Sequence, residues 1–518
     1  MKKTCLLFFA SFIIVTITRA QVGIGINPPD PSAMLHVQDT AKGLLIPRMT
    51  AAQRAAIQNP AEGLLVYQVS PDKSFWYFTD GQWKNLTANN NGGKHTLYLA
   101  DGITNAQALA KIATDVGPNT QEVRIIRCTN LTSVDLSMIT NLTEIYMSNN
   151  SVLQSVNFDN LQSVDAGVWI DQCPALTSLP LSHLQSIGVS IDGAYGLHIT
   201  NTGLLAMNMN LVTRLEGSLT IRFNPALTTI SFPLVTQFLA TPSTGLPFVI
   251  QENGQLSSVL FPSLTKSKTI LIDNNYNLAT VNFSALISAD GFSIDYAKLM
   301  TALSLPVLTK SGYMSIVSND LLNTVSMPVL DSLNNGFTLT SNNVLPSISL
   351  PSLKSVYNLS ITDNPLLTSF SAPLLNRQTY GFTVQNNNAL TALSFPSLLS
   401  AVNVSIQTNP ALISFSAPLM TNLSSNTSFT PVIISDNANL TSINIDALTT
   451  LSGYGFNAQG NKLASAQVNY LLHKFATITP ALSSKTFSLY QTPSAPPTGQ
   501  GITDKATLIS HSNTVDTN

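Results

Sequence analysis

Charge is scarce in this chain of 518 residues. Asp, Glu, Lys and Arg together make up 10% of the sequence, and the formal net charge at pH 7 is −2. Proteins that bind nucleic acid neutralise backbone phosphates with clustered Lys and Arg, and the sequence has no such basic stripe. A polybasic patch for a membrane surface is missing too. Nucleic acid is therefore not expected as a partner.

Long apolar runs are also scarce, and the one at the start of the chain is typical of an export signal. Lys2 and Lys3 precede the apolar stretch Leu6–Ile17, and the small residue Ala20 stands before Gln21. This order of basic, apolar and small residues predicts a signal peptide over residues 1–20. No later run approaches the length of a membrane span. We therefore expect a secreted or cell-surface protein without a membrane span after cleavage.

What the chain does have is an internal repeat. A motif close to I-x-x-N-x-x-L-x-S-[VIF]-x-[FLA]-[PS]-x-L recurs about every 22 residues from Arg124 to Leu448. Apolar residues two apart, such as Val404 and Ile406, mark a short strand with one buried face. One coil cannot bury that face alone, so neighbouring coils must stack to form the core. The pattern predicts a mainly β solenoid of about 14 coils of 22–23 residues.

A polar column follows the strand in nearly every repeat. An Asn at this point can bond the turning backbone of its own coil and of the next, which satisfies its buried amide. One coil has Ala297 there instead. We expect the other positions to form a buried Asn/Cys ladder: Cys128, Asn150, Cys173, Asn201, Asn224, Asn253, Asn275, Asn319, Asn342, Asn364, Asn387, Asn409 and Asn437.

The combination L-x-I-x-x-[NC]-x-x-L resembles the leucine-rich repeat, and the segments FPSL and LSITDNPLL resemble its receptor L-domain branch. The resemblance covers roughly residues 100–465. It implies a right-handed β-solenoid and a ligand-binding or structural surface protein. The repeats have no helical segment per coil, which favours a straighter, β-rich solenoid over a curved horseshoe.

The chain has too few cysteines for a disulfide framework. Of the three in the chain, Cys5 lies in the signal, which leaves Cys128 and Cys173. A pair of cysteines in a secreted protein often forms a disulfide. These two, however, occupy the same column two coils apart, so at about 4.8 Å per coil their Cα atoms are roughly 9–10 Å apart. That distance exceeds the reach of a disulfide, and we expect two free, buried thiols.

Residues 21–88 contain no repeat. The segment Gly43–Thr50 (GLLIPRMT) and the later Gly63–Tyr67 (GLLVY) resemble a module at the start of many secreted bacterial proteins, where it often precedes fibre-like or adhesive regions. The resemblance implies a small β-rich module, and homo-oligomerisation could occur through it. The closing FWYF and GQW segments predict two strands around a turn at Asp80-Gly81.

The expected organisation has six parts: a signal at 1–20, the N-terminal module at 21–88, a linker at 89–95, an N-terminal cap at 96–123, the solenoid at 124–463 and a C-terminal cap at 464–518. Helical spacing of Ala106, Leu109, Ile112, Ala113 and Val116 predicts a helix in the first cap. Val468, Leu471, Leu472 and Phe475 predict another in the second cap. Three longer coils place insertions near 193–196, 240–247 and 424–431, and insertions in a solenoid often form the binding face.

One group of outward strand positions stands out as a candidate ligand-binding site. Arg124, Tyr146, Trp169 and Asp171 fall on the first three coils, whereas later coils carry mostly Ser, Thr and Gln there. Exposed aromatic rings beside Arg and Asp can stack on a sugar and bond its hydroxyls. The alternative is that the rings only pack over the junction with the cap.

Asp273 and Asp295 share an outward column on adjacent coils, about 5 Å apart by coil spacing. Two such acids could serve a retaining glycosidase or hold Ca²⁺, but no third acid joins them, and two solvated charges remain the simpler interpretation. The six His residues are not at metal-ligand spacing.

We expect no enzyme activity, cofactor or metal, and a binding or adhesion protein for an extracellular glycan or protein. A structural stalk is the alternative, and a polysaccharide-degrading enzyme is less favoured.

Overall fold

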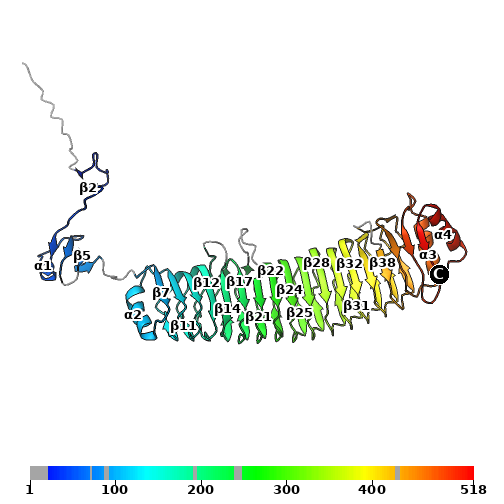
Figure 1. Cartoon of the computed structure of the whole chain (residues 1–518), viewed down its shortest axis with the longest axis horizontal. Coiled ribbons are helices and arrows are strands. Elements are labelled where there is room, and N and C mark those ends of the chain that lie inside the picture. Colours follow the sequence, from blue (N-terminus) through cyan, green and yellow to red (C-terminus); the bar gives the residue numbers. More distant parts are fainter. Residues whose placement is uncertain (1–20, 71–72, 87–92, 191–194, 239–247, 426–431) are drawn as a thin grey trace, which may run out of the picture. The chain divides into compact units, whose positions relative to one another are not determined.

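The computed structural model describes residues 21–70, 73–86, 93–190, 195–238, 248–425 and 432–518. The signal predicted at 1–20 and most of the linker predicted at 89–95 lie outside these ranges. The chain divides into two compact units, Met1–Asn91 and Gly92–Asn518. Each unit is described by itself (Figure 1).

The N-terminal unit is small and mostly β. Strands β1 (Val22–Ile24) and β2 (Leu35–Val37) pair in parallel. A four-stranded sheet follows, of β3 (Arg48–Met49), β4 (Leu65–Gln68), β5 (Ser74–Thr79) and β6 (Gln82–Asn85), with helix α1 (Ala51–Ala55) after β3. The turn predicted at Asp80-Gly81 joins β5 to β6, which are antiparallel, and both residues have positive φ, 52° and 74°. This is the backbone that a tight hairpin turn requires.

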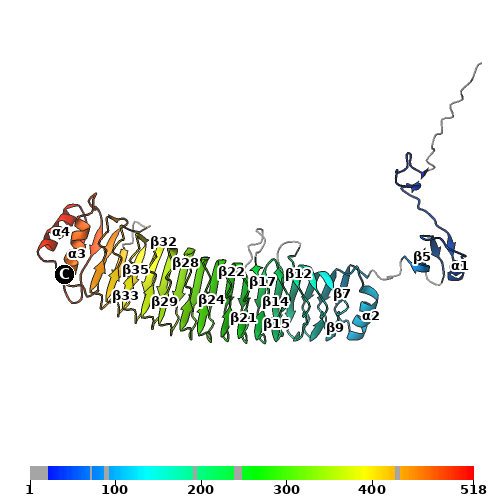
Figure 2. The ribbon, with the colours of Figure 1, turned by 180° about the vertical axis from the view of Figure 1, so that it is seen from behind.

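The second unit is a parallel β-solenoid whose strands stack one behind another from cyan to red in Figure 1, and from behind in Figure 2. One long sheet runs along it, and the strands of neighbouring coils pair in parallel. The register shifts at a bulge in some of these pairs. Its strands are β7 (Thr96–Ala100), β8 (Glu122–Ile126), β10 (Asn141–Ser148), β12 (Ser163–Cys173), β13 (Ser186–Ile187) with β14 (Leu197–Thr202), β16 (Arg214–Leu215) with β17 (Leu219–Arg222), β19 (Gln237–Phe238) with β20 (Phe248–Gln251), β22 (Lys266–Asp273), β24 (Ser288–Asp295), β26 (Lys310–Val317), β28 (Ser332–Thr340), β30 (Ser355–Thr362), β32 (Arg377–Gln385), β34 (Ser400–Val402) with β35 (Val404–Gln407), β37 (Asn422–Ser424) with β38 (Val432–Ser435), β40 (Thr450–Leu451) with β41 (Gly455–Asn457), β42 (Thr486–Ser488) and β43 (Thr514–Asp516).

Several coils divide this long strand into two halves at a bulge. The three insertions expected from the repeat spacing all fall between such halves, because they separate β13 from β14, β19 from β20 and β37 from β38. Most of their residues lie outside the described ranges. The flanking strands nevertheless place all three insertions at the same step of the coil.

The other side of each coil is a strand of about three residues, and these also stack in parallel. They form three ladders: β9 (Ser133–Asp135) with β11 (Ser155–Asn157); β15 (Ala206–Asn208), β18 (Thr229–Ser231), β21 (Ser258–Leu260) and β23 (Thr280–Asn282); and β25 (Ala302–Ser304), β27 (Thr324–Ser326), β29 (Ser347–Ser349), β31 (Ser369–Ser371), β33 (Ala392–Ser394), β36 (Ser414–Ser416) and β39 (Ser442–Asn444).

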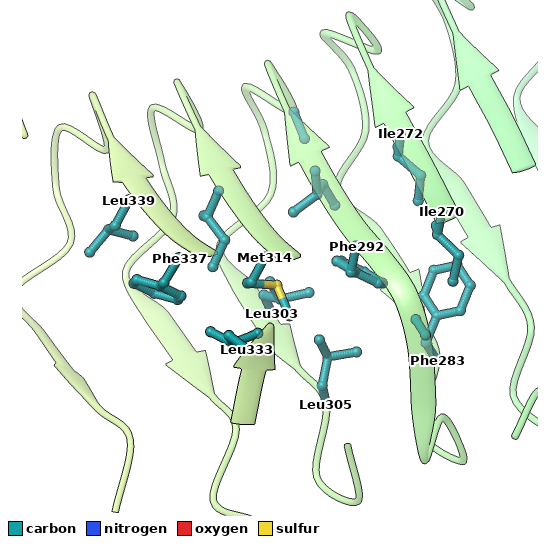
Figure 3. Close-up of a cluster of buried hydrophobic side chains, with 14 of the residues drawn as sticks. Ile270, Ile272, Phe283, Phe292, Leu303, Leu305, Met314, Leu333, Phe337 and Leu339 are labelled. Carbon is teal, nitrogen blue, oxygen red and sulfur yellow. The ribbon is translucent and has the colours of Figure 1, made fainter. Parts of the chain in front are cut away.

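The core lies between the long and short strands of each coil. Inward residues of both, such as Phe292, Leu303 and Met314, are buried and meet across the coil (Figure 3). Phe232, Phe261 and Phe283 form a continuous stack through three coils, with ring centroids 5.0 and 5.7 Å apart. Each buried aromatic removes a large apolar area from water, so the stacked coils together supply the core that one coil lacks.

Helices cover both ends of the solenoid (Figure 1). Helix α2 (Asn105–Asp115) begins at a capping box in which Thr104 and Gln107 bond each other's backbone. It buries Ile112, as the helical spacing predicted, and also Ala108, which was not among the predicted residues. The expectation was wrong for Ala106, Leu109 and Ala113, because these three residues lie on the exposed side of the helix.

At the far end, helix α3 (Ser465–Ala476) buries the predicted Val468, Leu471, Leu472 and Phe475. Helix α4 (Gln500–Ser510) follows in the same cap. The cap strands β7, β42 and β43 pair with the solenoid strands, so the long sheet extends beyond the predicted range of 124–463 on both sides. Within the described residues, no helix is long and apolar enough to cross a membrane.

Candidate ligand-binding surfaces

The Asn ladder is a structural column inside the solenoid. In a typical coil, the Asn253 side chain donates to the carbonyl of Ile221 in the preceding coil (3.0 Å) and accepts from the backbone N–H of Asn224 (3.1 Å). The same pattern recurs down the column, and each ladder Asn that follows Asn224 is fully buried. Because every amide is satisfied by backbone, the column stabilises the turn instead of presenting polar groups to a ligand.

The residue before each ladder position has a left-handed backbone. Its φ lies between 52° and 58° in each of the 14 coils that the repeat predicted, although the residue is as varied as Phe223, Asp363 and Thr408. Such a conformation costs of order 1 kcal/mol in a residue other than Gly. In most coils the hydrogen bonds of the adjacent Asn offset this cost. The same φ at Gln172, Asn201 and Tyr296, which precede Cys173, Thr202 and Ala297, shows that stacking on neighbouring coils holds the turn where its own coil has no Asn.

One ladder residue was predicted wrongly. Asn201 has φ 52° and takes the position before the ladder, and its side chain donates outward to Asp171 (3.1 Å). Thr202 occupies the ladder instead, and its backbone N–H and hydroxyl both donate to Asn224 (3.0 and 2.7 Å). The turn after Thr202 is one residue shorter than in the other coils, since Leu204 fills the buried Leu position. Counting back from that Leu therefore gave the wrong residue.

The ladder also continues where the repeat motif fades. Asn461 accepts from the backbone of Asn437, Gln491 from Leu463, and Asn518 from Gln491, at 3.0, 3.2 and 3.1 Å. The spacings there are irregular because helices α3 and α4 replace the short strands. The signal that could have revealed them is an amide side chain just after each cap strand.

Both ladder cysteines are free and buried. Burial raises the pKa of the Cys128 thiol to about 11 and raises that of Cys173 as well. The amide of Asn150 lies between the two cysteines, accepting from the Cys128 backbone and donating to the Cys173 sulfur (2.9 and 3.5 Å). An intervening coil therefore keeps the two sulfurs apart, as the repeat register implied.

Three residues of the predicted sugar-binding site, Arg124, Tyr146 and Trp169, lie in one outward column, which Tyr98 and His198 extend at its two ends. The Trp169 ring is parallel to His198 at 3.6 Å on one side and to Tyr146 at 6.3 Å on the other. Tyr195 also meets its edge, at 5.1 Å. With neighbours along both faces, the Trp169 ring has no open face for a sugar, and this geometry favours the packing interpretation.

The side chains of Arg124 and Asp171 also form ion pairs or hydrogen bonds with neighbouring residues. Arg124 lies over the Tyr146 ring and forms ion pairs with Glu122 (3.2 Å) and Glu144. Asp171 accepts from Thr200 (2.5 Å) and from Asn201. A cleft of about 270 Å³ remains beside this group, lined by Glu122, Arg124, Thr143, Glu144, Ala166, Ser190 and Tyr195. Glu144 was missed from the sequence because it follows a bulge, and Tyr195 because it lies in an insertion. His198 was missed because the shorter turn after Thr202 shifted the count by one residue.

Asp273 and Asp295 are direct neighbours in the long sheet. Burial raises the pKa of both carboxyls, and the charge of Asp273 adds to the rise at Asp295. Each is hydrogen-bonded laterally, Asp273 to Gln251 (2.9 Å) and Asp295 to Ser293 and Ser315 (2.6 and 3.0 Å). Over the part of the chain that the structure describes, no three His, Cys, Asp or Glu residues are grouped to hold a metal ion.

Stacked parallel coils, a long sheet opposite ladders of short strands, and a buried Asn column define the class: a parallel β-solenoid. Residues 23–99 match the family model described as the phage tail like trimerisation region. No curated protein matches the chain.

Similar solved structures include a leucine-rich repeat protein from Bacteroides ovatus, with 13% identity and a TM-score of 0.22 over 75% of this chain and 91% of that one. A TLR13–ssRNA13 complex has 14% identity and a TM-score of 0.17, with 76% of this chain and 56% of that one covered. The pneumococcal vaccine antigen PcpA has 13% identity and a TM-score of 0.13, with 88% and 99% covered. At these values the likenesses carry no argument about function.

Proposed function

We propose that this chain is an exported, non-catalytic binding protein that presents a ligand-binding face on its solenoid. The ligand is an extracellular glycan or protein. Export is supported by the basic, apolar and small residues of 1–20.

The observation that carries the proposal is the regular outer face of the long sheet. From β28 to β35 its outward columns hold short polar side chains, with Thr338, Ser360, Thr383 and Ser405 in register along one of them. A surface that repeats every strand spacing of about 4.8 Å is suited to a ligand that also repeats. A rigid, pre-formed surface of this kind loses little entropy on binding.

The test is binding of residues 21–518 to an array of extracellular polysaccharides and to candidate extracellular proteins, with product analysis alongside. Saturable binding without turnover supports the proposal. Release of smaller saccharides would overturn it in favour of an enzyme, and an Asp273→Asn variant would then show whether the acid pair is responsible.

A second role, as the stalk of a homo-oligomer, is favoured by a separate observation in the N-terminal unit. The match of residues 23–99 is to a trimerisation region. Large apolar side chains of this unit are exposed, among them Met34 (69%), Leu44 (65%) and Leu45 (78%), while Val66 is the one hydrophobic side chain buried among its described residues. A unit with so small a core of its own is completed by other copies.

The stalk is tested on the same mature chain by light scattering after size exclusion. A trimer that dissociates in the Leu44→Glu, Leu45→Glu double variant supports association through this unit. If the wild-type protein is a monomer at micromolar concentration, the stalk proposal is wrong. The proposed binding role of the solenoid does not depend on this result.

A further inference from the structure

One pair of tyrosines on the long sheet differs from the aromatic column of the first coils. Tyr357 on β30 and Tyr380 on β32 are stacked, with ring centroids 4.9 Å apart and planes 9° from parallel. Both are well exposed, at 42% and 50%. They sit at the bulge where the register of β30 and β32 shifts, which takes both residues out of the normal in–out alternation.

A cleft of about 290 Å³ opens beside this pair. It is lined by Leu333, Asn334, Ser355, Val356, Tyr357, Arg377 and Thr379, from three successive coils. Tyr380 supports the Tyr357 ring from the next coil, so the ring that borders the cleft is held in place before any ligand arrives. A fixed aromatic wall with an amide and hydroxyls around it is the usual composition of a sugar subsite.

The charge of the cleft comes from Arg377. Its side chain is exposed, and among the described residues no acid lies within ion-pair distance of it. The neighbouring Lys354 is already paired with Asp331, at 2.6 Å. Arg124 of the first coils contrasts with Arg377, because two carboxylates hold it.

A second cationic side chain, Lys310, lies in the same column of the long sheet as Arg377. Lys310, Ser332, Ser355 and Arg377 are partners in register on β26, β28, β30 and β32. Three strand spacings separate Lys310 from Arg377, or about 14 Å. The length of one pyranose unit is comparable to a single spacing, so a chain of sugars laid along the solenoid axis would pass both cations and the Tyr357 ring.

We propose that the cleft at Tyr357, Tyr380 and Arg377 binds a linear polysaccharide whose sugars carry carboxylates. Tyr357 stacks on a pyranose ring, and the Arg377 guanidinium takes a carboxylate in a bidentate contact. Asn334 and Thr379 bond the hydroxyls. This rests on the proposed binding function and specifies its ligand class and its place on the solenoid.

The chain contains a matched control for Arg377. Arg214 occupies the equivalent column on β16 and borders a cleft of about 250 Å³ with Thr213, Leu215, Glu216, Thr236 and Gln237. Its guanidinium is paired with Glu216 at 2.8 Å, and that cleft has no aromatic residue. Arg214→Gln removes the same charge from the same kind of position without touching the proposed site.

The experiment is calorimetric titration of residues 21–518 with oligomers of mannuronate and guluronate, and with neutral cello-oligosaccharides of equal length. We expect binding of the acidic oligomers that weakens with salt, since exposed charges are screened. Arg377→Gln and Tyr357→Ala should each weaken it about tenfold or more, a loss of roughly 1.4 kcal/mol, while Arg214→Gln leaves it unchanged. Thermal melts of each variant check folding.

Other outcomes separate this site from the general function. Acidic oligomers bound equally by Arg377→Gln and Tyr357→Ala, or weakened as much by Arg214→Gln, would overturn the site but leave the binding function. Preference for the neutral oligomers would overturn the ligand class alone. If no glycan binds, this inference fails, and the proposed function survives only with a protein ligand.

Discussion

The ring of Trp169 lies parallel to that of His198, with centroids 3.6 Å apart and planes 3° from parallel. The two residues are register partners on adjacent coils, although an insertion separates them in sequence. Burial lowers the pKa of His198 from 6.5 to about 4. The stack therefore holds the imidazole neutral at physiological pH.

This stack predicts an acid-sensitive coil. The folded pKa of His198 is below its unfolded value, so the unfolded chain takes up a proton first as the pH falls. Stability is fully present above about pH 6.5 and declines toward pH 4. With partial exposure allowed for, the loss is about 2 kcal/mol. His198→Phe keeps an aromatic ring and should abolish this share of the loss.

The measurement is hydrogen exchange of the amides of Leu197–Thr202 at pH 7.5 and pH 4.5, corrected for intrinsic exchange rates. Wild type should lose more protection on acidification than His198→Phe. Equal losses in the two proteins would show that carboxylates elsewhere control the acid response.

Trp169 itself is predicted to stabilise the first coils and not to bind ligand. Trp169→Ala removes a ring that contacts Tyr146, Tyr195 and His198, at a cost of about 3 kcal/mol. Trp169→Phe should cost less, because a stacked ring remains. Binding of any glycan that wild type binds should persist at a temperature where the variant is folded. Loss of binding with an unchanged melting temperature would restore this column as a ligand site.

The ladder predicts a cost for removing one amide. Asn364 accepts from the backbone N–H of Asn342 (3.0 Å) and donates to the carbonyls of Leu339 (2.9 Å) and Thr362 (2.8 Å). Asn364→Ala leaves these buried groups unpaired, and we expect a loss of about 3 kcal/mol. The chain should still fold, because Ala297 already occupies one ladder position.

Urea denaturation followed by circular dichroism gives the comparison. The control is Ser360→Ala, on the outer side of the same coil, which should stay within about 0.5 kcal/mol of wild type. An Asn364→Ala midpoint equal to that of Ser360→Ala would mean that water or neighbouring groups satisfy the ladder.

We expect the thiols of Cys128 and Cys173 to be alkylated slowly in the folded protein. With the pKa of Cys128 at about 11, only roughly one thiolate in a thousand forms at pH 8, and burial hinders access further. Residues 21–518 should react with iodoacetamide slowly when native and at both positions once denatured. Intact mass gives the count. Failure to label after denaturation without reductant would reveal a disulfide and contradict the register of the coils.

The repeat architecture could be predicted from the sequence alone. Regular spacing of buried Leu and ladder Asn is a local, one-dimensional signal, and it predicted strands, stacking and the separation of Cys128 from Cys173. It failed where the spacing changed: Asn201 was assigned to a position that Thr202 fills, and the ladder residues Asn461 and Gln491 were missed.

Which outward residues have an open face could not be predicted from the sequence, because it depends on contacts between coils. Trp169 and Tyr357 look alike in sequence as aromatic residues on strands, yet neighbours border both faces of Trp169, whereas Tyr357 borders a cleft with Arg377. The difference depends on bulges and insertions, which change which side chains meet between coils without altering the repeat. The repeat spacing predicts which residues share a column. It does not predict which side chains from different columns and coils contact each other.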